Sequence, residues 1–310
     1  MMTRIMMLLS LLLMLSGSSQ SDLPRPVVAL LSDDNTIYKQ ALDSFKGSIN
    51  RNVLVYDLGG DIKKAPEVLK SIMQRKPALI FALGAKAAWF AKSATRDKTD
   101  TAVLFAMVLN HKRYQLHDGQ ANVTGISADV APGTQIFNLS LFSPGIKRIG
   151  VIYSQTHSTE TLLSAQRAAG ILGIELVAES IERAKEFPRA WRKMSDMVDA
   201  FWVLNDPVLY TLENIYWLKD RCLKERVICT GQSDNITRLG VLLSVSPDVK
   251  GVGVQAAAMA HDILNRGRKP ASLGIKPPLG TLLTLNESTA KKIGLVISES
   301  ARSVLTDVIK

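Results

Sequence analysis

Short apolar runs alternate with amphipathic segments along the chain, and this alternation is the feature that most constrains its fold. In the first half, helical patterns such as "IYKQALDSFKGSI" (37–49) and "APEVLKSIMQR" (65–75) separate apolar runs that have the length of strands. Strands that are apolar throughout and alternate with helices predict a parallel sheet covered by helices on both faces. The expected strands lie at 27–31, 53–56, 78–82, 103–107 and 123–126.

The second half repeats this order of elements. The stretch "ALIFALGAKAAWFAK" (78–92) has the layout of "AFWVLNDPVLYTLEN" (200–214), although few residues are identical. Such a duplication predicts an α/β fold with two doubly wound parallel-sheet lobes, in which ligands bind beyond the carboxyl ends of the strands. Further strands are expected at 149–153, 174–178, 200–204 and 227–230, and helices at 158–173, 190–198 and 210–221.

The chain is expected to cross between the two lobes three times, which makes a three-strand hinge. Glycine and proline mark the first crossing near 126–131, the helical pattern at 248–267 is assigned to the first lobe, and 279–310 offers one more strand and two helices to the second. The predicted boundaries are 22–126 plus 247–275 for lobe 1, and 127–246 plus 276–310 for lobe 2.

The first 21 residues differ from the rest of the chain. Arg4 precedes an apolar run at 6–15, and small residues follow at 16–19, which is the layout of a secretory signal peptide. The apolar run has only about half of the ~20 residues that a membrane-spanning helix needs. No cysteine follows it to carry a lipid anchor. We therefore expect a cleaved signal peptide over 1–21, a periplasmic location and no stable membrane insertion.

Two cysteines, Cys222 and Cys229, are the only ones in the chain. In an exported protein they could form a disulfide. Alternatively, Cys222 ends a helix and Cys229 is a small buried residue of the next strand, which is the slightly favoured interpretation. No histidines cluster with them, so a zinc site is not expected.

Several functional classes lack the residue patterns that they need. The chain has 38 Lys and Arg against 28 Asp and Glu, but these basic residues are scattered and form no stripe with stacking aromatics, so no nucleic-acid partner is expected. Neither a phosphate loop of the type G-x-x-x-x-G-K-[ST] nor a nucleophile elbow of the type G-x-S-x-G occurs. The four histidines show no metal-ligand spacing. We therefore predict a protein that is not an enzyme and needs no metal or cofactor.

Small polar side chains and carboxylates follow the predicted strands, at the edge of each sheet where a ligand would bind. Such groups can hold the ammonium, carboxylate and hydroxyl groups of a zwitterion. Helix capping is the alternative role for the serines and acids among them. The candidates in lobe 1 are Ser32, Asp33, Tyr38, Gly84, Ala85, Lys86 and Asn110, and those in lobe 2 are Ser154, Gln155, Asn205, Asp206, Gln232, Ser233 and Asp234. Asp206 is the candidate partner of an ammonium group, and His111 and His157 are expected near the mouth of the cleft.

The glycine after the third predicted strand, Gly84, begins a helix with Lys86 in its first turn. Unpaired amides and the helix dipole favour an anion at such a position, so a ligand carboxylate is expected there. Lys86 either assists as a counter-ion or points to solvent. The aromatic residues divide into two that are expected to stack on a ligand, Tyr38 and Tyr210, and three that are expected in the core, Trp89, Phe90 and Trp202.

Four stretches carry a resemblance to a known family: "NVTGIS" (122–127), "IKRIGVIYS" (146–154), "AAAMAHDILNRGRKPA" (256–271) and "AKKIGLVISES" (290–300). They are similar to the exported substrate-binding proteins of ABC transporters that share the type I periplasmic binding fold, in the family that includes tryptophan and tyrosine binders. The resemblance extends from Val27 over nearly the whole chain. It implies two lobes that close on a small molecule and then dock on a membrane permease. By position, it implies pocket residues at Gly84, Ala85, Asn110, Asn205, Asp206, Ser233 and Asp234.

These observations lead to one expected function and one alternative. We expect a monomeric binding protein that takes an amino acid or a related small carboxylate, aromatic ones included, and delivers it to an ABC permease. The alternative is a periplasmic sensing or partner-binding module with the same fold and no transport role.

Overall fold

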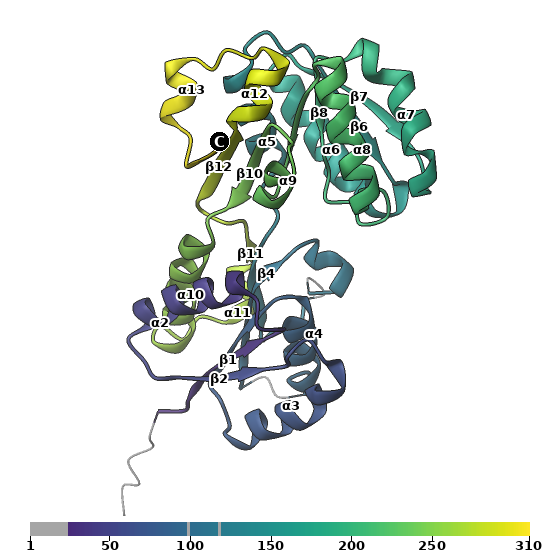
Figure 1. The fold of residues 1–310 in the computed structure, drawn as a ribbon. Helices are drawn as coiled ribbons and strands as arrows, with labels where there is room; N and C mark the ends of the chain where they lie inside the picture. Colours follow the sequence, from purple (N-terminus) through teal and green to yellow (C-terminus); the bar gives the residue numbers. More distant parts are fainter. Residues whose placement is uncertain (1–23, 98–99, 117–118) are drawn as a thin grey trace, which may run out of the picture.

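The computed structural model describes residues 24–97, 100–116 and 119–310, so the expected signal peptide at 1–21 lies outside the described part. Two α/β lobes are stacked one above the other (Figure 1). The predicted α/β class with two parallel-sheet lobes is confirmed. No helix in the described part of the chain is both long enough and apolar enough to cross a membrane.

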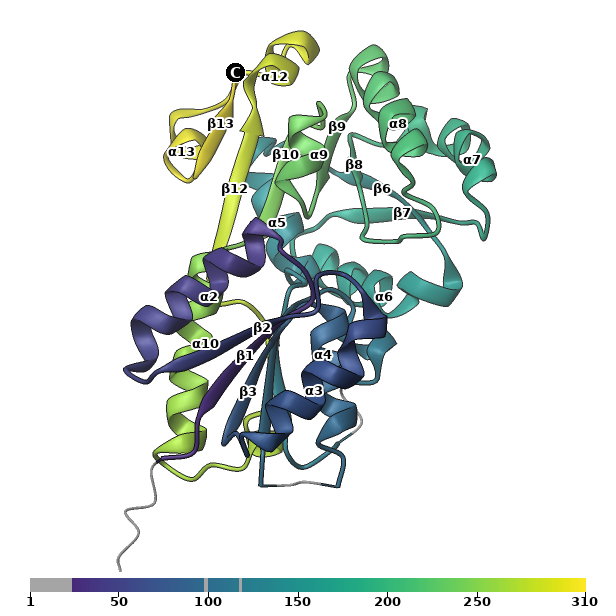
Figure 2. The same ribbon diagram turned by 60° about the horizontal axis from the view of Figure 1, so that its bottom comes forward.

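Lobe 1 contains a six-stranded sheet with the strand order β11-β5-β4-β3-β1-β2, in which all pairs are parallel. Its strands are β1 (Val27–Leu31), β2 (Val53–Asp57), β3 (Leu79–Leu83), β4 (Ala102–Val108), β5 (Val123–Ser127) and β11 (Ile275–Lys276). Helices α2 (Thr36–Ile49) and α10 (Val249–Leu264) cover one face, and α3 (Ala65–Gln74) and α4 (Ala85–Ala94) cover the other (Figure 2). The short helices η1 (Ile62–Lys64), η2 (His111–Tyr114) and α11 (Pro270–Leu273) complete the lobe.

Lobe 2 contains a seven-stranded sheet with the order β13-β12-β10-β9-β8-β6-β7. Its strands are β6 (Arg148–Tyr153), β7 (Glu175–Ser180), β8 (Ala200–Trp202), β9 (Ile228–Gly231), β10 (Leu243–Pro247), β12 (Thr281–Asn286) and β13 (Asp307–Ile309). Helices α5 (Pro132–Phe142) and α6 (Gln155–Ile171) pack on one face, and α7 (Phe187–Met194) and α8 (Leu212–Glu225) pack on the other. The remaining helices are η3 (Ala184–Glu186), η4 (Ser195–Met197), α9 (Asp234–Arg238), α12 (Glu287–Ile293) and α13 (Glu299–Ser303).

The end of the chain differs from the sequence prediction in two respects. β12 runs antiparallel to β10, because β10 leads into the hinge at Pro247 whereas β12 leaves the hinge at Thr281. In addition, 279–310 forms two strands instead of the expected one, since β13 pairs with β12. β13 has only three residues and little burial, so its sequence lacks the apolar run that revealed the other strands.

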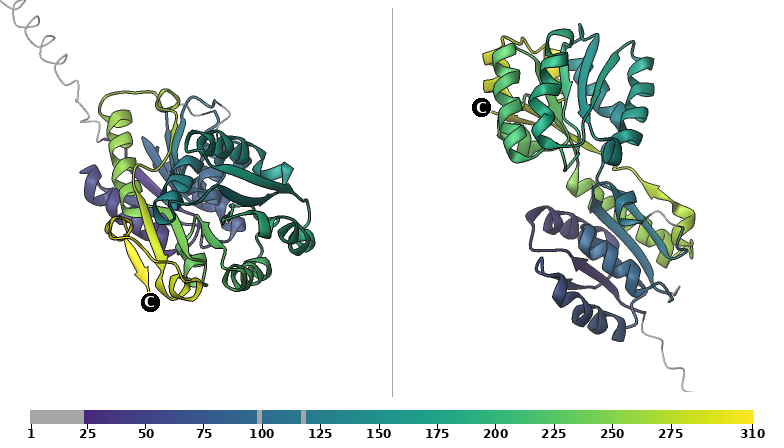
Figure 3. Two further views of the ribbon diagram at one scale, coloured as in Figure 1. Left: turned by 90° about the horizontal axis from the view of Figure 1, so that it is seen from above. Right: turned by 90° about the vertical axis from the view of Figure 1, so that its right-hand side faces the viewer.

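Three segments join the lobes: 128–131, Asp248 and 277–280. The last two lie side by side, since Asp248 donates its backbone N–H to the Gly280 carbonyl at 2.9 Å. The side chain of Asp248 also accepts a hydrogen bond from the Lys250 amide and so caps α10. Figure 3 shows that this connection is narrow compared with either lobe. Bending of a few backbone dihedrals in these segments is therefore enough to change the separation of the lobes.

The two cysteines are joined by a disulfide, which corrects the favoured sequence interpretation. That interpretation placed the cysteines correctly, since Cys222 lies in the last turn of α8 and Cys229 lies in β9, but it left them unbridged. Their Cα atoms are 6.3 Å apart, within the range that a disulfide spans. The sequence did not reveal that the two cysteines lie close together, because the turn of the short loop between them depends on how α8 packs on the sheet.

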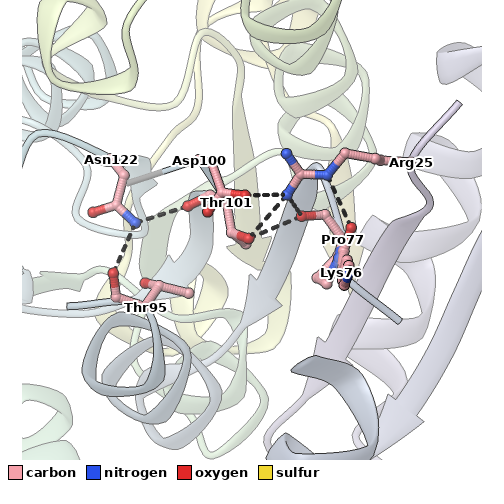
Figure 4. A network of polar contacts seen from close by, with 7 residues as sticks. All are labelled: Arg25, Lys76, Pro77, Thr95, Asp100, Thr101 and Asn122. Atoms are coloured by element: carbon pink, nitrogen blue, oxygen red, sulfur yellow. Dashed lines mark hydrogen bonds and ion pairs between the residues drawn. The ribbon is translucent and has the colours of Figure 1, made fainter. Parts of the chain in front are cut away.

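At the amino ends of the lobe 1 strands, far from the cleft, a polar network holds the start of the described chain (Figure 4). The Arg25 guanidinium donates to the Pro77 carbonyl at 2.7 Å and pairs with Asp100 at 3.0 Å. Asn122 donates its side-chain amide to the Thr101 carbonyl at 2.7 Å. These contacts join the entries to β1, β3, β4 and β5, so they stabilise the end of the sheet opposite to the functional loops.

Candidate functional site

A cavity of about 490 Å³ lies between the lobes and is named here the cleft cavity. It lies beyond the carboxyl ends of β8 and β9 and extends along α6. Residues of both lobes and of the first hinge segment line it. Its polar lining consists of Asn110, His111, Lys112, Asp129, His157, Ser158, Glu160, Thr161, Ser164, Arg167, Asn205 and Gln232.

Next to it lies an apolar pocket of about 230 Å³, which is lined by lobe 2 except for Leu109 and shares Leu204, Asn205 and Gln232 with the cleft cavity. Tyr210 lines this pocket, as expected of a ring near the ligand, but its hydroxyl is already bound to the Ile152 carbonyl at 2.8 Å. Burial raises the pKa of Tyr210, so the hydroxyl stays protonated. The other apolar lining residues are Leu109, Val203, Pro207, Leu212, Ile215, Ile236 and Leu239.

On lobe 1, aromatic side chains surround a cavity of about 520 Å³, named here the ring pocket. Its lining residues are Ser32, Asp33, Tyr38, Ile62, Ala85, Lys86, Trp89, Phe90 and Tyr114. Trp89 is 46% exposed, which corrects the expectation that it lies in the core. Phe90 is partly buried and meets the Trp89 ring edge-on at 4.9 Å. Trp202 is fully buried as expected.

The helix start at Gly84 is already occupied by contacts within the protein. Ser32 Oγ accepts a hydrogen bond from the Ala87 amide at 3.0 Å, so Ser32 caps α4. Lys86 Nζ donates to the Gly60 carbonyl at 2.7 Å. The expected carboxylate site thus loses one amide and its lysine to internal partners, and the geometry favours the capping role of Ser32.

Gly84 also allows a close approach of Tyr38. It has φ of +87°, and a Cβ at this position would lie 2.5 Å from the Tyr38 hydroxyl oxygen and 2.6 Å from Ser32 Oγ. Burial, and then the charge of Asp33, raise the pKa of Tyr38. The Tyr38 hydroxyl is therefore a neutral donor beside the ring pocket at physiological pH.

Asp206, the expected ammonium partner, is 1% exposed and is bound on both oxygens. Oδ2 accepts from the Ser154 amide at 3.0 Å, from Ser154 Oγ at 2.7 Å and from Ser158 Oγ at 2.7 Å. Oδ1 accepts from the amides of Val208 and Leu209. This geometry favours a structural role for Asp206, which holds the loop after β8 against the start of α6.

The remaining lobe 2 candidates divide into two groups. Ser233 caps α9, and Asp234 lies 3.5 Å from Arg238 of the same helix. Asn205 and Gln232 instead face both the cleft cavity and the apolar pocket. The Gln232 Oε1 atom is buried and has no hydrogen-bond partner among the described residues. Gln155 lies outside both groups, and its backbone amide donates to Glu182.

Asn110 closes the cleft cavity from lobe 1. Its φ of +46° is left-handed, and its amide donates to Asp129 of the hinge at 2.8 Å. Met107, with φ of +58°, lies within the irregular end of β4, where the register with β5 shifts. Such an irregularity redirects the chain that follows. It places η2 toward α6.

One ion pair joins η2 to α6 across the opening, between Lys112 and Glu160. A further cavity of about 440 Å³ is lined by this same pair. Lys112, Glu160 and Arg167 were not among the predicted site residues, because only the loops that follow strands were expected to line the cleft. The sequence signal for Glu160 and Arg167 was their helical spacing along one face of α6, at 157, 160, 161, 164 and 167.

Comparison with known sequences identifies the family of the chain. The sequence model described as ABC transporter substrate binding protein matches residues 40–309. The chain belongs to this family. No curated protein matches the sequence.

Solved structures confirm the type I periplasmic binding fold. The ligand-free, open structure of a substrate-binding protein with adhesive properties from Clostridium difficile has a TM-score of 0.77 and 18% identity, over 92% of this chain and 99% of that one. An ABC domain in complex with L-Trp from Streptococcus pneumonia has a TM-score of 0.64 and 21% identity, over 93% and 100%. The leucine-binding protein LivK from Thermotoga maritima has a TM-score of 0.53 and 10% identity, over 78% and 83%.

In this substrate-binding protein, the cleft therefore offers three surfaces: a polar cavity between the lobes, an apolar pocket in lobe 2 and an aromatic wall in lobe 1. The part of the chain that the structure describes contains no group of three or more His, Cys, Asp or Glu residues that is placed to hold a metal ion.

Proposed function

We propose that this protein binds a small solute, an amino acid or a related small carboxylate, in the cleft between the lobes and delivers it to an ABC permease. The observation that carries the proposal is the buried, unpartnered Gln232 Oε1 at the junction of the cleft cavity and the apolar pocket. A buried acceptor without a hydrogen bond costs about 1–3 kcal/mol, which a bound donor would recover.

The two adjoining cavities suit a solute with a polar and an apolar end. The cleft cavity, at about 490 Å³, has the size of a small-molecule site, for which ~300–1,000 Å³ is usual. The apolar pocket can take an aromatic or branched side chain while the polar groups stay near Asn205 and Gln232. Aromatic amino acids are therefore the first ligands to test.

Closure of the lobes follows from the same geometry. A solute held on lobe 2 favours the closed state only through contacts that the open state lacks. The ring pocket of lobe 1, with Trp89 and Tyr38, supplies such contacts when the lobes approach. We propose that 22–126 with 247–275, and 127–246 with 276–310, move as rigid lobes about the hinge.

An exported protein fits the remaining features. The sequence at 1–21 has the layout of a signal peptide, and the disulfide suits an oxidising compartment such as the periplasm. We propose a periplasmic monomer whose partner is an inner-membrane permease.

A thermal-shift screen of the mature protein against the proteinogenic amino acids tests the binding role. A ligand at 100 times its Kd adds about 2.7 kcal/mol to stability, which raises the midpoint of unfolding measurably. We expect a selective shift with one or a few amino acids and its loss in Gln232→Ala. The matched control is Gln166→Ala, on the exposed side of α6. No shift with any amino acid would contradict the proposed ligand class.

Delivery needs a separate measurement. In proteoliposomes that contain the cognate permease and its ATPase, the loaded protein should stimulate both ATP hydrolysis and uptake of the solute. A protein that binds its ligand without stimulating either would instead be a sensing module.

A further inference from the structure

A chain of hydrogen bonds runs from a buried carboxylate to an imidazole on the lobe 2 wall of the cleft cavity. Ser154 Oγ lies 2.7 Å from Asp206 Oδ2 and 3.2 Å from His157 Nδ1. Ser154 is fully buried and Asp206 nearly so, whereas His157 lines the cavity. The carboxylate and the serine therefore expose almost no surface, and the imidazole is the member of this hydrogen-bonded chain that lines the cleft cavity.

The direction of these hydrogen bonds follows from the donors that surround Asp206. Three donors converge on Oδ2 and two on Oδ1, so the carboxylate acts only as an acceptor. Ser154 has a single hydroxyl hydrogen, and it donates this hydrogen to the carboxylate in a hydrogen bond. Ser154 Oγ must therefore accept from His157, which requires a hydrogen on Nδ1.

This arrangement fixes the character of the other ring nitrogen. A neutral imidazole with its hydrogen on Nδ1 has a lone pair on Nε2. Because Nδ1 is turned toward buried Ser154, Nε2 lies on the side of the ring that is directed away from it, toward the cavity that His157 lines. The negative charge of Asp206 behind Ser154 further favours a donor in front of the ring.

We propose that His157 is a ligand-contacting residue whose Nε2 accepts a hydrogen bond from the solute, and that Ser154 and Asp206 are positioning residues that set its tautomer. The solute part of this inference rests on the proposed function. Gln232 Oε1 is a second unpartnered acceptor on the same cavity. Two acceptors on residues that line one cavity call for a solute with an ammonium, amide or hydroxyl donor.

The lobe 2 side of the cleft cavity also offers a partner for an anionic group of the solute. Arg167 lines the cleft cavity on α6 and makes no hydrogen bond or ion pair with another described residue. The two acids of the lining are engaged, since Asp129 accepts from Asn110 and Glu160 pairs with Lys112. A zwitterion therefore fits with its ammonium group toward His157 and Gln232 and its carboxylate toward Arg167.

Heteronuclear NMR of the imidazole nitrogens tests the positioning without any ligand. In mildly alkaline buffer, His157 of the mature protein should carry its hydrogen on Nδ1, the reverse of the tautomer that free histidine favours. Ser154→Ala removes the acceptor, so the His157 signal should move toward the Nε2–H form. His261, exposed on α10, is the internal control and should not respond. An Nε2–H tautomer for His157 in the unmodified protein would overturn the inference.

Affinity measurements with the amino acid that the screen identifies test the contact. His157→Ala should weaken binding by about tenfold, as expected for a lost hydrogen bond to a charged group. His157→Gln places an amide oxygen close to the position of Nε2 and should recover part of the loss. The deaminated analogue of the same amino acid should bind the unmodified protein and His157→Ala equally weakly. Full affinity in His157→Ala would overturn the contact.

The two proposals can fail separately. If no amino acid shifts the midpoint of unfolding, the proposed ligand class is wrong, while the tautomer of His157 still decides whether the wall is built as described. If an amino acid binds but the His157 ring signals do not move on its addition, the binding role stands and the His157 contact is overturned.

Discussion

The two halves of the cleft come from equivalent strand ends, yet they present different chemistry. In lobe 1 the serine that follows β1, Ser32, caps α4, and the cavity surface beside it is aromatic. In lobe 2 the serine that follows β6, Ser154, donates a hydrogen bond to the carboxylate of Asp206. The cavity beside it is lined by Gln232, whose Oε1 atom has no hydrogen-bond partner among the described residues. The repeated topology thus sets where the loops meet, and the side chains decide which half recognises polar groups.

The cause of this difference lies in the third strand of each repeat. In lobe 1, α4 begins directly after β3, so a glycine and a capping serine are enough to turn the chain. In lobe 2, a longer loop separates β8 from α8, and Asp206 organises it through five hydrogen bonds. Asp206, which the sequence offered as a partner of a ligand ammonium group, is therefore needed to hold that loop.

The largest expected effect comes from removing the tight turn of lobe 1. Gly84→Ala places a Cβ 2.5 Å from the Tyr38 hydroxyl oxygen in a left-handed conformation. Backbone strain and displacement of Tyr38 should together lower the free energy of unfolding by about 3 kcal/mol. Chemical denaturation of the purified variant measures this change.

The matched control is Gly267→Ala. Gly267 has φ of +63°, but no atom lies within 4 Å of its added Cβ. It should therefore show only the backbone cost, about 1 kcal/mol. Equal losses in the two variants would mean that the contact of Gly84 with Tyr38 and Ser32 contributes nothing.

A smaller effect, confined to lobe 2, is expected on removal of the disulfide. The bridge between Cys222 and Cys229 closes a short loop, for which chain entropy predicts about 2 kcal/mol. The double variant C222A/C229A should therefore lose about that much stability. Hydrogen exchange should show the loss in β9 and α8, with lobe 1 amides unchanged. A uniform loss over both lobes would show that they unfold as one unit.

The sequence predicted the strands that form apolar runs and missed β11 and β13, which have only two and three residues and no such run. The central strands of both sheets form apolar runs, so their order and their repeat were readable, whereas the exposed β13 was not. Asn205 and Gln232 were found because they follow strands. The roles of Ser32 and Asp206 could not be assigned, because the same residue types serve as caps and as ligand contacts, and only their tertiary neighbours decide. Arg167 could not be identified as a lining residue either, because this depends on which face of α6 meets the other lobe.

Substitution of Trp89 tests whether the ring pocket of lobe 1 takes part in recognition of the solute. Trp89→Ala should lower affinity for an aromatic amino acid by about fivefold, since ring contacts contribute ~1 kcal/mol. The stability of the protein should change by less than about 0.5 kcal/mol, because the side chain is already 46% exposed. Tyr216→Ala, at 48% exposure and outside the cavities described above, is the control for nonspecific effects of removing a ring. Equal affinity in both variants would leave recognition to lobe 2 alone.

The ion pair between Lys112 and Glu160 tests how the two halves are held relative to one another, and it has the smallest expected effect. Both side chains are largely exposed, and such pairs contribute about 0–1 kcal/mol. Lys112→Glu places like charges across the opening, which should disfavour approach of the lobes and lower the apparent affinity by about threefold at low salt. The loss should fade as salt screens the repulsion.

A charge swap separates this pair from direct contact with the solute, since Lys112 also lines the cleft cavity. The double variant K112E/E160K restores opposite charges at the same two positions but leaves no lysine on the lobe 1 side. Recovery of affinity in the swap would assign the effect to attraction between the lobes. A loss that persists in the swap and at high salt would instead mean that Lys112 touches the solute, and lobe 1 would then contribute a cation as well as rings to recognition.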